Sequence, residues 1–253
     1  MRITRIYTPQ PLSTDCQIIL EASASAHLVK VLRLRTGAVV VLFNGDGFDY
    51  QAELISPRAE VAQLQIHSRT SGALESPLRV TLIQALCRGE KMDWVLEKAC
   101  ELGVHAIVPI SSERSEVHLS PERAAKRREH WQRVVLSACE QSGRAYVPQV
   151  AALKELSHYL AESTDPALRW VLEPGGAPLA SLPGLAGAGA IAVAVGPEGG
   201  WSDRDLAQLT HARFTAVELG PRILRTETAG VAVLACLQTL AGDFAGSGLA
   251  ARQ

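Results

Sequence analysis

The sequence predicts an α/β protein in which a small β-barrel precedes a larger domain built on a parallel sheet. Residues 1–70 hold several short runs of β-branched and apolar residues, and the turn at residues 44–47 is a strong hairpin signal. From Leu78 onward, strand-like runs alternate with segments of helical period, the order that forms a parallel sheet. We therefore expect a barrel over residues 1–70, a polar linker over 71–77 and an α/β domain over 78–245.

The first 70 residues contain three segments of strand composition, which are QIILEA, AVVVLFNGDGFDYQAEL and VAQLQIH in the one-letter code. The second of these folds back on itself at its NGDG turn. Only SAHLVKVLRL departs from this pattern, and its spacing predicts one short helix. Several short strands within about 70 residues are typical of a small barrel.

The second domain is predicted to alternate strands with helices. The strand candidates are LRVTLIQAL, VHAIVPI, LRWVLEP, GAIAVAV and FTAVELG. The helix candidates are EKMDWVLEKACELG, the long segment capped by Ser120, SDRDLAQLTHA and the segment from Thr226 onward. Residues 190–195 show no polar alternation, so this strand should be covered on both faces. The helix from Thr226 is apolar almost all round and should lie at the centre of the domain.

Composition places the chain among soluble globular proteins. Hydrophobic residues make up 47% of its 253 residues, and no apolar run approaches the ~18 residues that a membrane span needs. The polar N-terminal segment lacks the apolar region of a signal peptide. The five cysteines are scattered without a C-x-x-C pair, and no H-E-x-x-H motif is present. We therefore expect a cytoplasmic protein with no metal ion, no disulfide framework and no membrane partner.

The arginine content is compatible with a nucleic-acid partner despite a net charge of −1. Of the 25 basic side chains, 20 are arginine, whose planar fork suits phosphate oxygens better than the point charge of lysine. Residues 123–133 form a strongly basic run. Two interpretations of this run stay open, a solvated helix face and a surface that contacts RNA.

Two loops follow strands at the edge where open α/β sheets bind ligands. In VGPEGGWSDRDL, the glycines allow a close backbone approach, and Ser202 with Asp205 predicts a capped helix start. The second loop lies within VELGPRILRTETAG. Either loop alone is also consistent with an ordinary connection shaped by its proline. Together they indicate a ligand site, because they concentrate four charged residues at one edge: Glu198, Arg222, Arg225 and Glu227.

Three common motifs of nucleotide binding and hydrolysis are missing from the sequence. There is no G-x-G-x-x-G after a strand, no G-x-x-x-x-G-K-[ST] and no G-x-S-x-G. Dinucleotide, triphosphate and serine-hydrolase sites therefore lack their usual support.

The two loops carry a family resemblance. GPEGGWS followed by LGPRILRTETAGVAVLACLQ resembles the C-terminal signature of the 16S rRNA uridine-N3 methyltransferases of the RsmE type, which belong to the SPOUT class. The likeness extends upstream through HLVKVLRLRTG, KMDWVLEKACELGV, PISSERS and ACEQSGRAYVPQV, so it covers most of the chain. The first motif alone is weak, whereas LGPRILRTETA at this spacing is highly specific.

The resemblance implies a C-terminal SPOUT α/β domain with a deep trefoil knot and an N-terminal PUA-like β-barrel that helps to hold RNA. It also implies a homodimer with S-adenosyl-L-methionine as the cofactor. The implied product is 3-methyluridine near the 3′ end of small-subunit rRNA. The partner would then be 16S rRNA or the small ribosomal subunit.

The expected cofactor site combines backbone groups of the two loops with the end of a neighbouring strand. Its residues are Leu172, Gly196, Glu198, Gly199, Gly200, Leu219, Gly220, Ile223, Leu224 and Thr228. Glu198 has few cationic neighbours within its own loop, so a solvated ion pair is disfavoured. Two roles stay open for it, a hydrogen bond to the cofactor ribose and one to the adjoining loop.

Methylation of uridine N3 requires that the imide proton be removed, because N3 has no free lone pair before that. A positioned general base typically contributes about 10²–10⁴-fold to such a step. Our hypothesis is that Arg225 stabilises the developing uridine anion while Glu227 orients Arg225 or takes the proton. The alternative is a purely structural ion pair between Arg225 and Glu227.

RNA contacts are expected from arginines spread along the chain: Arg33, Arg35, Arg88, Arg114, Arg127 and Arg144. Two other functions stay open. One is a related SPOUT enzyme that methylates tRNA ribose, although the pairing of the two motifs favours the base-modifying family. The other is an RNA-binding or ribosome-assembly factor without catalysis, against which the intact glycine loop argues.

Overall fold

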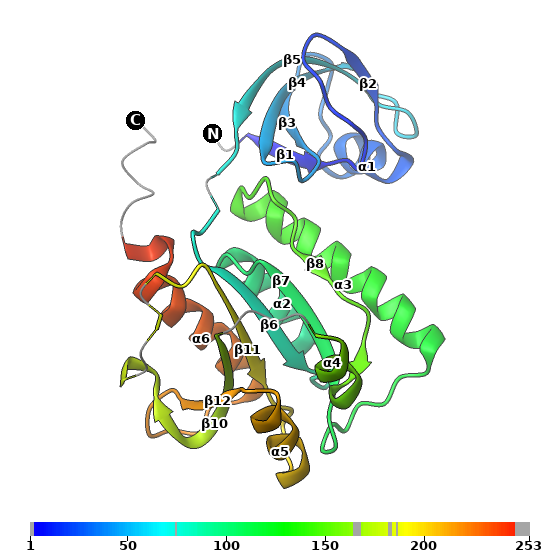
Figure 1. The fold of residues 1–253 in the computed structure, drawn as a ribbon. Coiled ribbons are helices and arrows are strands. Elements are labelled where there is room, and N and C mark those ends of the chain that lie inside the picture. The colour runs from blue at the N-terminus through cyan, green and yellow to red at the C-terminus, as the bar shows by residue number, and fades with distance from the viewer. Residues whose placement is uncertain (1–2, 74, 164–167, 182–183, 186, 246–253) are drawn as a thin grey trace. The chain divides into compact units, whose positions relative to one another are not determined.

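The computed structural model describes residues 3–73, 75–163, 168–181, 184–185 and 187–245 (Figure 1). The chain divides into two compact units. One comprises Met1–Glu75 with Leu136–Val147, and the other comprises Ser76–Val135 with Pro148–Gln253. No helix among the described residues is long and apolar enough to cross a membrane.

The first unit is built on a five-stranded sheet with the strand order β1-β3-β4-β5-β2. Its strands are β1 (Thr4–Tyr7), β2 (Gln17–Ile19), β3 (Val39–Phe43), β4 (Phe48–Ser56) and β5 (Gln63–Ser71). The predicted hairpin is confirmed, because β3 pairs antiparallel with β4 across the turn at residues 44–47. Both glycines of this turn have positive φ, Gly45 at 94° and Gly47 at 89°, which glycine adopts at little cost. Alternate strand residues point into one apolar core.

The short helix predicted in this unit begins three residues earlier than expected, and its second half has π-helical instead of α-helical hydrogen bonds. It consists of α1 (Ala22–Ala26) and a π-helical turn over His27–Val31. Leu28 in that turn is fully buried against the core of the sheet.

The C-terminal end of α3 (Pro121–Ser142) and the residues after it belong to the first unit. The backbone N–H of Tyr7 donates to the Glu140 carboxylate at 3.0 Å, and the Arg5 guanidinium donates to the Arg144 carbonyl at 3.1 Å. Arg144 also donates to both carboxylate oxygens of Glu75. These polar contacts join segments more than 65 residues apart in the chain, so a division by composition along the sequence does not reveal them.

The second unit contains a seven-stranded sheet, and its parallel pairing is as predicted. The strand order is β12-β10-β11-β6-β7-β8, with β9 paired to β7, and all these pairs are parallel. The strands are β6 (Arg79–Ala85), β7 (Ala106–Ser111), β8 (Gln149–Val150), β9 (Lys154–Glu155), β10 (Arg169–Pro178), β11 (Ala190–Val195) and β12 (Thr215–Glu218). Central β11 is buried over residues 191–195, which confirms the strand that was expected to be covered on both faces.

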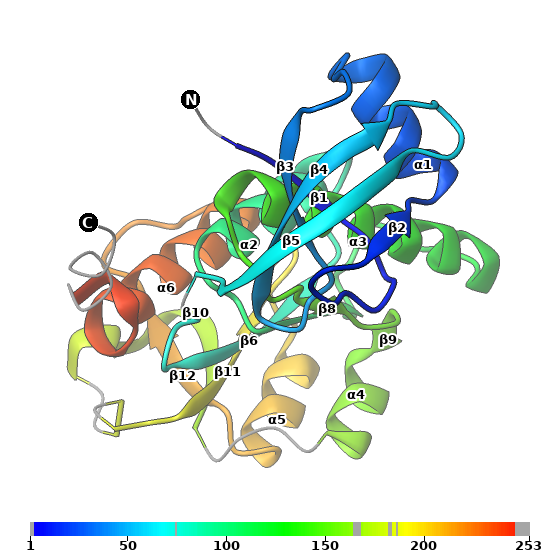
Figure 2. The same cartoon turned by 90° about the horizontal axis from the view of Figure 1, so that it is seen from above.

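Helices cover both faces of this sheet. They are α2 (Lys91–Glu101), α3, α4 (Leu156–Glu162), α5 (Asp203–His211) and α6 (Thr226–Ala241). Figure 2 shows α2 and α6 on one side of the sheet and α4 and α5 on the other. The predicted caps are present: Ser202 and Asp205 form a reciprocal capping box on α5, and Ser120 accepts from the Arg123 N–H at the start of α3. The sequence did not predict α4, β8 or β9.

The expectation that α6 lies at the centre of its domain is wrong. One face is buried against β6, β11 and α2, through residues spaced by three and four: Thr226, Gly230, Val233, Leu234, Leu237 and Gln238. On the opposite face Cys236 and Leu240 are exposed, Leu240 to 52%. An apolar pattern all round a helix predicts that both faces are covered, but it does not say that the same chain covers both.

Candidate functional site

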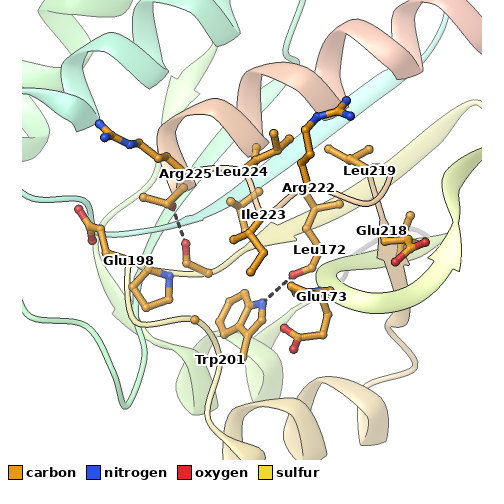
Figure 3. A pocket seen from close by; sticks show the side chains of 18 of the residues that line it. Leu172, Glu173, Glu198, Trp201, Glu218, Leu219, Arg222, Ile223, Leu224 and Arg225 are labelled. Carbon is orange, nitrogen blue, oxygen red and sulfur yellow. Dashed lines mark hydrogen bonds between the residues drawn. The ribbon is translucent and has the colours of Figure 1, made fainter.

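The carboxyl ends of β10, β11 and β12 open into a pocket of about 640 Å³ within the second unit (Figure 3). Its lining comes from these strand ends, the loops that follow them, α6 and the start of α2: residues 172–175, 195–201, 217–226, Lys91 and Ala229. The two loops identified in the sequence therefore form one site, at the edge where parallel sheets bind ligands.

Most of the residues predicted to hold a cofactor line this pocket. They are Leu172, Gly196, Glu198, Gly199, Gly200, Leu219, Gly220, Ile223 and Leu224. Arg225 also lines the pocket. Thr228 does not line the pocket; it is an exposed residue in the first turn of α6.

The loop after β11 presents backbone to the pocket because the space beside two of its glycines is already filled by other residues. A Cβ atom on Gly196 would lie 3.2 Å from the Trp201 ring, and one on Gly199 would lie 3.2 Å from Cβ of Arg114. The indole Nε1 of Trp201 donates to the Leu172 carbonyl at 3.1 Å, which fixes the ring against β10. The Arg114 guanidinium donates to the Gly199 carbonyl at 3.3 Å. Side chains at these glycines would therefore displace the walls of the site.

Thr226, the first residue of α6, links the two loops. Its hydroxyl donates to the Gly196 carbonyl at 2.5 Å and accepts from Nε2 of Gln84 at 3.0 Å. Both side chains are buried. The Cys87 thiol lies 3.9 Å from the same hydroxyl, and burial raises its pKa to about 12, so this thiol stays protonated at neutral pH. Nothing in the sequence marked Gln84 as part of the site, because its side chain is uncharged and belongs to no recognised motif.

Glu198 obtains its partners from α2 and the residues before it. Its carboxylate accepts from the Arg88 backbone N–H at 3.1 Å, and the Lys91 ammonium lies 3.4 Å away. Partial burial raises the pKa of Glu198, but the hydrogen bonds to its carboxylate and the charge of Lys91 outweigh this effect and hold the pKa below its ordinary value. A count of cations within its own loop misses Lys91, because that residue lies 107 positions earlier in the chain.

Glu227 and Arg225 have different surroundings. The Glu227 carboxylate lies 3.2 Å from the Lys91 ammonium, and its side chain is only 14% exposed. Arg225 is the exposed N-cap residue of α6 and lines the pocket. The ion pair of Glu227 among the described residues is therefore with Lys91, which argues against the alternative of a structural Arg225–Glu227 pair.

The pocket has charges of both signs. Figure 3 shows Glu198 and Arg225 on one side of it and Glu173 and Glu218 on the other. Burial raises the pKa of Glu173, and the Arg114 charge only partly opposes this effect. Glu218 accepts from the Gly175 backbone N–H at 3.2 Å. Sequence reasoning missed both acids, because Glu218 lies one residue before the second motif and Glu173 lies on β10, away from both motifs.

Two predicted RNA-contacting arginines lie beside the site. Arg88 is exposed and pairs with Glu116, and Arg114 contacts the glycine loop directly. The other candidates lie elsewhere. Arg127 is exposed on the part of α3 in the second unit, and Arg33 and Arg35 are exposed in the first unit.

Arg144 has different surroundings from the other candidates. Arg144 is only 6% exposed, and its guanidinium forms an ion pair with the Glu75 carboxylate. Because a buried guanidinium presents no surface to a phosphate, we leave Arg144 out of the RNA contacts proposed below. Among the described residues, no group of three or more His, Cys, Asp or Glu side chains is placed to hold a metal ion.

Comparison with known proteins identifies the family. Residues 74–238 match the RNA methyltransferase domain family, and residues 20–66 match the RNA methyltransferase PUA domain. The ribosomal RNA small subunit methyltransferase E of Bacillus subtilis is 31% identical over 231 residues, which cover 86% of this chain and 89% of that protein. The protein of that name from Neisseria gonorrhoeae, solved bound to S-adenosyl methionine, is 39% identical with a TM-score of 0.88, and the match covers 96% of this chain and 100% of that one.

A Legionella pneumophila protein solved with the cofactor SAM bound has a TM-score of 0.91 at 34% identity, again over 96% of this chain and 100% of that one. The matched domains and relatives span both units and include the whole pocket. The chain therefore belongs to the ribosomal RNA small subunit methyltransferase E family of RNA methyltransferases.

Proposed function

We propose that this protein binds S-adenosylmethionine in the pocket and methylates N3 of a uridine in 16S rRNA, giving 3-methyluridine near the 3′ end of the molecule. The observation that carries the proposal is the backbone-lined pocket formed by the two loops whose sequences resemble the uridine-N3 methyltransferases. The family assignment supports an rRNA methyltransferase, and the motif resemblance supports the N3 position.

The pocket fits the proposed cofactor. Its volume of about 640 Å³ lies within the range of about 300–1,000 Å³ that is usual for cofactor sites. The backbone of Leu219, Gly220, Ile223 and Leu224 would read the edge of the adenine, and the loop around Gly199 would enclose the ribose and methionine parts. The carboxylates and arginines around the pocket suit a ligand that carries charges of both signs.

S-adenosylmethionine supplies a methyl group on a sulfonium centre, and the protein must position that centre and manage the N3 proton of the uridine. Arg225 lines the pocket with an exposed guanidinium, so it can stabilise the negative charge that develops over O2, N3 and O4. Glu227 faces Lys91 instead of lining the pocket. We therefore favour a role for Glu227 in supporting the site over direct removal of the proton.

Glu227→Gln is expected to lower the rate of methyl transfer by about tenfold or more while the dissociation constant for S-adenosylmethionine changes by less than about threefold. The reason is that the substitution removes a buried charge near the reacting groups, whereas the glutamine amide oxygen can accept a hydrogen bond from the Lys91 ammonium and the pocket lining stays intact. Single-turnover rates and a calorimetric cofactor titration measure the two effects separately. Equal losses of both, or loss of the fold, would contradict this role.

Recognition of the RNA is proposed to use the first unit and exposed arginines of both units: Arg33, Arg35, Arg88, Arg114 and Arg127. Phosphate contacts release counterions, so binding should weaken steeply as salt is raised. The target uridine must also leave its stack to reach the pocket, which costs a few kcal/mol.

The resemblance further implies a trefoil knot and a homodimer, and the scattered cysteines favour a cytoplasmic site of action; we propose all three. The knot rests on the resemblance, and the hydrogen bond from Thr226 to Gly196 places the loops after β11 and β12 in direct contact. The exposed apolar residues on the outer face of α6 support the dimer.

The experiment that tests the proposal incubates the purified protein with labelled S-adenosylmethionine and small ribosomal subunits from a strain that lacks the modification. The rRNA is digested to nucleosides, which are resolved by mass spectrometry. Label in 3-methyluridine is the expected result. Label in a ribose-methylated nucleoside would overturn the N3 assignment and favour the related ribose methyltransferases, and failure to bind the cofactor would favour a non-catalytic RNA-binding protein.

A further inference from the structure

Among the residues that the structure describes, Lys91 is the one cation that contacts the carboxylates of both Glu198 and Glu227. It is the first residue of α2, and its side chain lines the pocket. Its ammonium lies 3.4 Å from Oε1 of Glu198 and 3.2 Å from Oε2 of Glu227. The first acid follows β11 and the second lies in the first turn of α6, so one side chain connects three separate segments of the site.

The two carboxylates beside Lys91 favour a positively charged side chain at this position. Glu227 is largely buried, and a buried carboxylate is unfavourable unless it is paired. The close carboxylate of Glu227 raises the pKa of Lys91, and Glu198 adds to the effect, so the ammonium stays charged throughout the neutral range. A neutral side chain at this position would leave two carboxylates near one another without their shared counter-charge.

We propose that Lys91 is a positioning residue that holds Glu198 and Glu227 together, so that the glycine loop and the start of α6 keep the spacing that the cofactor requires. It acts through these two carboxylates and not on the reacting atoms. The inference rests on the proposed binding of S-adenosylmethionine in this pocket, and it does not depend on which atom of the RNA is methylated.

The test compares Lys91→Met and Lys91→Arg with Lys98→Met as a matched control. Lys98 lies on the same helix and pairs with Glu97 and Glu101, away from the pocket. Lys91→Met is expected to raise the calorimetric dissociation constant for S-adenosylmethionine by about tenfold, because the charge of Glu227 loses its partner. Lys91→Arg should recover most of the affinity, and Lys98→Met should bind like the wild type.

A double-mutant cycle separates positioning from a general loss of packing. If Lys91 acts by neutralising Glu227, Lys91→Met combined with Glu227→Gln should bind the cofactor more tightly than Lys91→Met alone, because the unpaired charge is gone. Simple loss of the lysine stem predicts no such recovery. Thermal unfolding of every variant checks the fold, and Lys91→Gln replaces the methionine variant if that one does not fold.

The outcomes distinguish this inference from the proposed function. Wild-type affinity in Lys91→Met, or additive losses in the cycle, would overturn the role of Lys91 and leave the methyltransferase proposal standing. A wild-type protein that binds the cofactor but does not form 3-methyluridine would overturn only the uridine assignment, since the cycle needs no RNA. A wild-type protein that does not bind the cofactor would overturn both.

Discussion

The hydroxyl of Thr226 is the smallest group on which the site depends. It donates to the Gly196 carbonyl and accepts from Gln84, and the side chains of Thr226 and Gln84 are both buried. A buried polar group that loses its partner costs about 1–3 kcal/mol. The identity of this one side chain is therefore expected to affect both the stability of the unit and the shape of the pocket.

Thr226→Val keeps the shape of the side chain but removes the hydroxyl, which leaves the Gln84 amide and the Gly196 carbonyl without that partner. We expect the free energy of unfolding to fall by about 1–3 kcal/mol and the affinity for S-adenosylmethionine to fall with it. Denaturant titration and calorimetry measure the two quantities.

Two control variants make this prediction specific. Thr226→Ser retains the hydroxyl and should stay close to the wild type in both measurements. Thr228→Val changes the same residue type at an exposed position two residues away and should have little effect. If Thr226→Val and Thr228→Val behaved alike, the hydroxyl would not be what joins the loops.

Among the elements of the fold, the loop after β11 owes its position to charges on other segments. The pKa of Glu198 lies below its ordinary value of 4.5, so the stabilisation it provides is complete above that value and is lost as the pH falls through the folded-state pKa. Glu173, on the other side of the pocket, has a raised pKa because it is partly buried. Its ionised form therefore opposes folding once the pH rises above its ordinary value.

These two carboxylates should change acid sensitivity in opposite directions. Between about pH 6 and about pH 3, the free energy of unfolding should fall less in Glu198→Gln than in the wild type, because the substitution removes a group that favours folding only when ionised. It should fall more in Glu173→Gln, which removes a group that favours folding when protonated. Urea titrations across this range measure both slopes, and a shared direction of change would disprove the assignment of opposite environments.

Elements that depend on local pattern could be predicted from the sequence, and those that depend on distant partners could not. The NGDG hairpin, the Ser202 capping box and the buried strand β11 follow from neighbouring residues, and all three are present. Short strands such as β8 have too few residues to show a period.

The residues of the site likewise divide into those that local motifs predicted and those that come from distant segments. Glycine and arginine motifs located the two loops that line the pocket, because their spacing is local. Lys91 and Gln84 reach the site from segments 107 and 142 positions away from their partners, and nothing in their own neighbourhoods marks them. Only the order of the strands brings them to one edge of the sheet.

At the scale of the whole molecule, α6 presents an apolar face that the described part of the chain leaves open. Leu240 is 52% exposed and Phe244, just beyond the helix, is 50% exposed, while Cys236 lies one turn before Leu240. Ile223, in the loop that leads into the same helix, is 86% exposed although it lines the pocket. A second copy of the chain that covered this face would remove apolar surface from water close to the site.

We therefore expect the wild type to sediment as a dimer at micromolar concentration and the double variant Cys236→Arg with Leu240→Arg to sediment as a monomer. Arginine on both sides of a two-fold interface would place like charges in an apolar contact, which is unfavourable. Val61→Arg is the matched control, because Val61 is 43% exposed in the first unit and is not part of this face. If dimerisation also covers Ile223, the monomeric variant should bind S-adenosylmethionine more weakly than Val61→Arg. A double variant that remained dimeric would exclude this face as the interface, and a monomer with wild-type cofactor affinity would show that the pocket is complete within one chain.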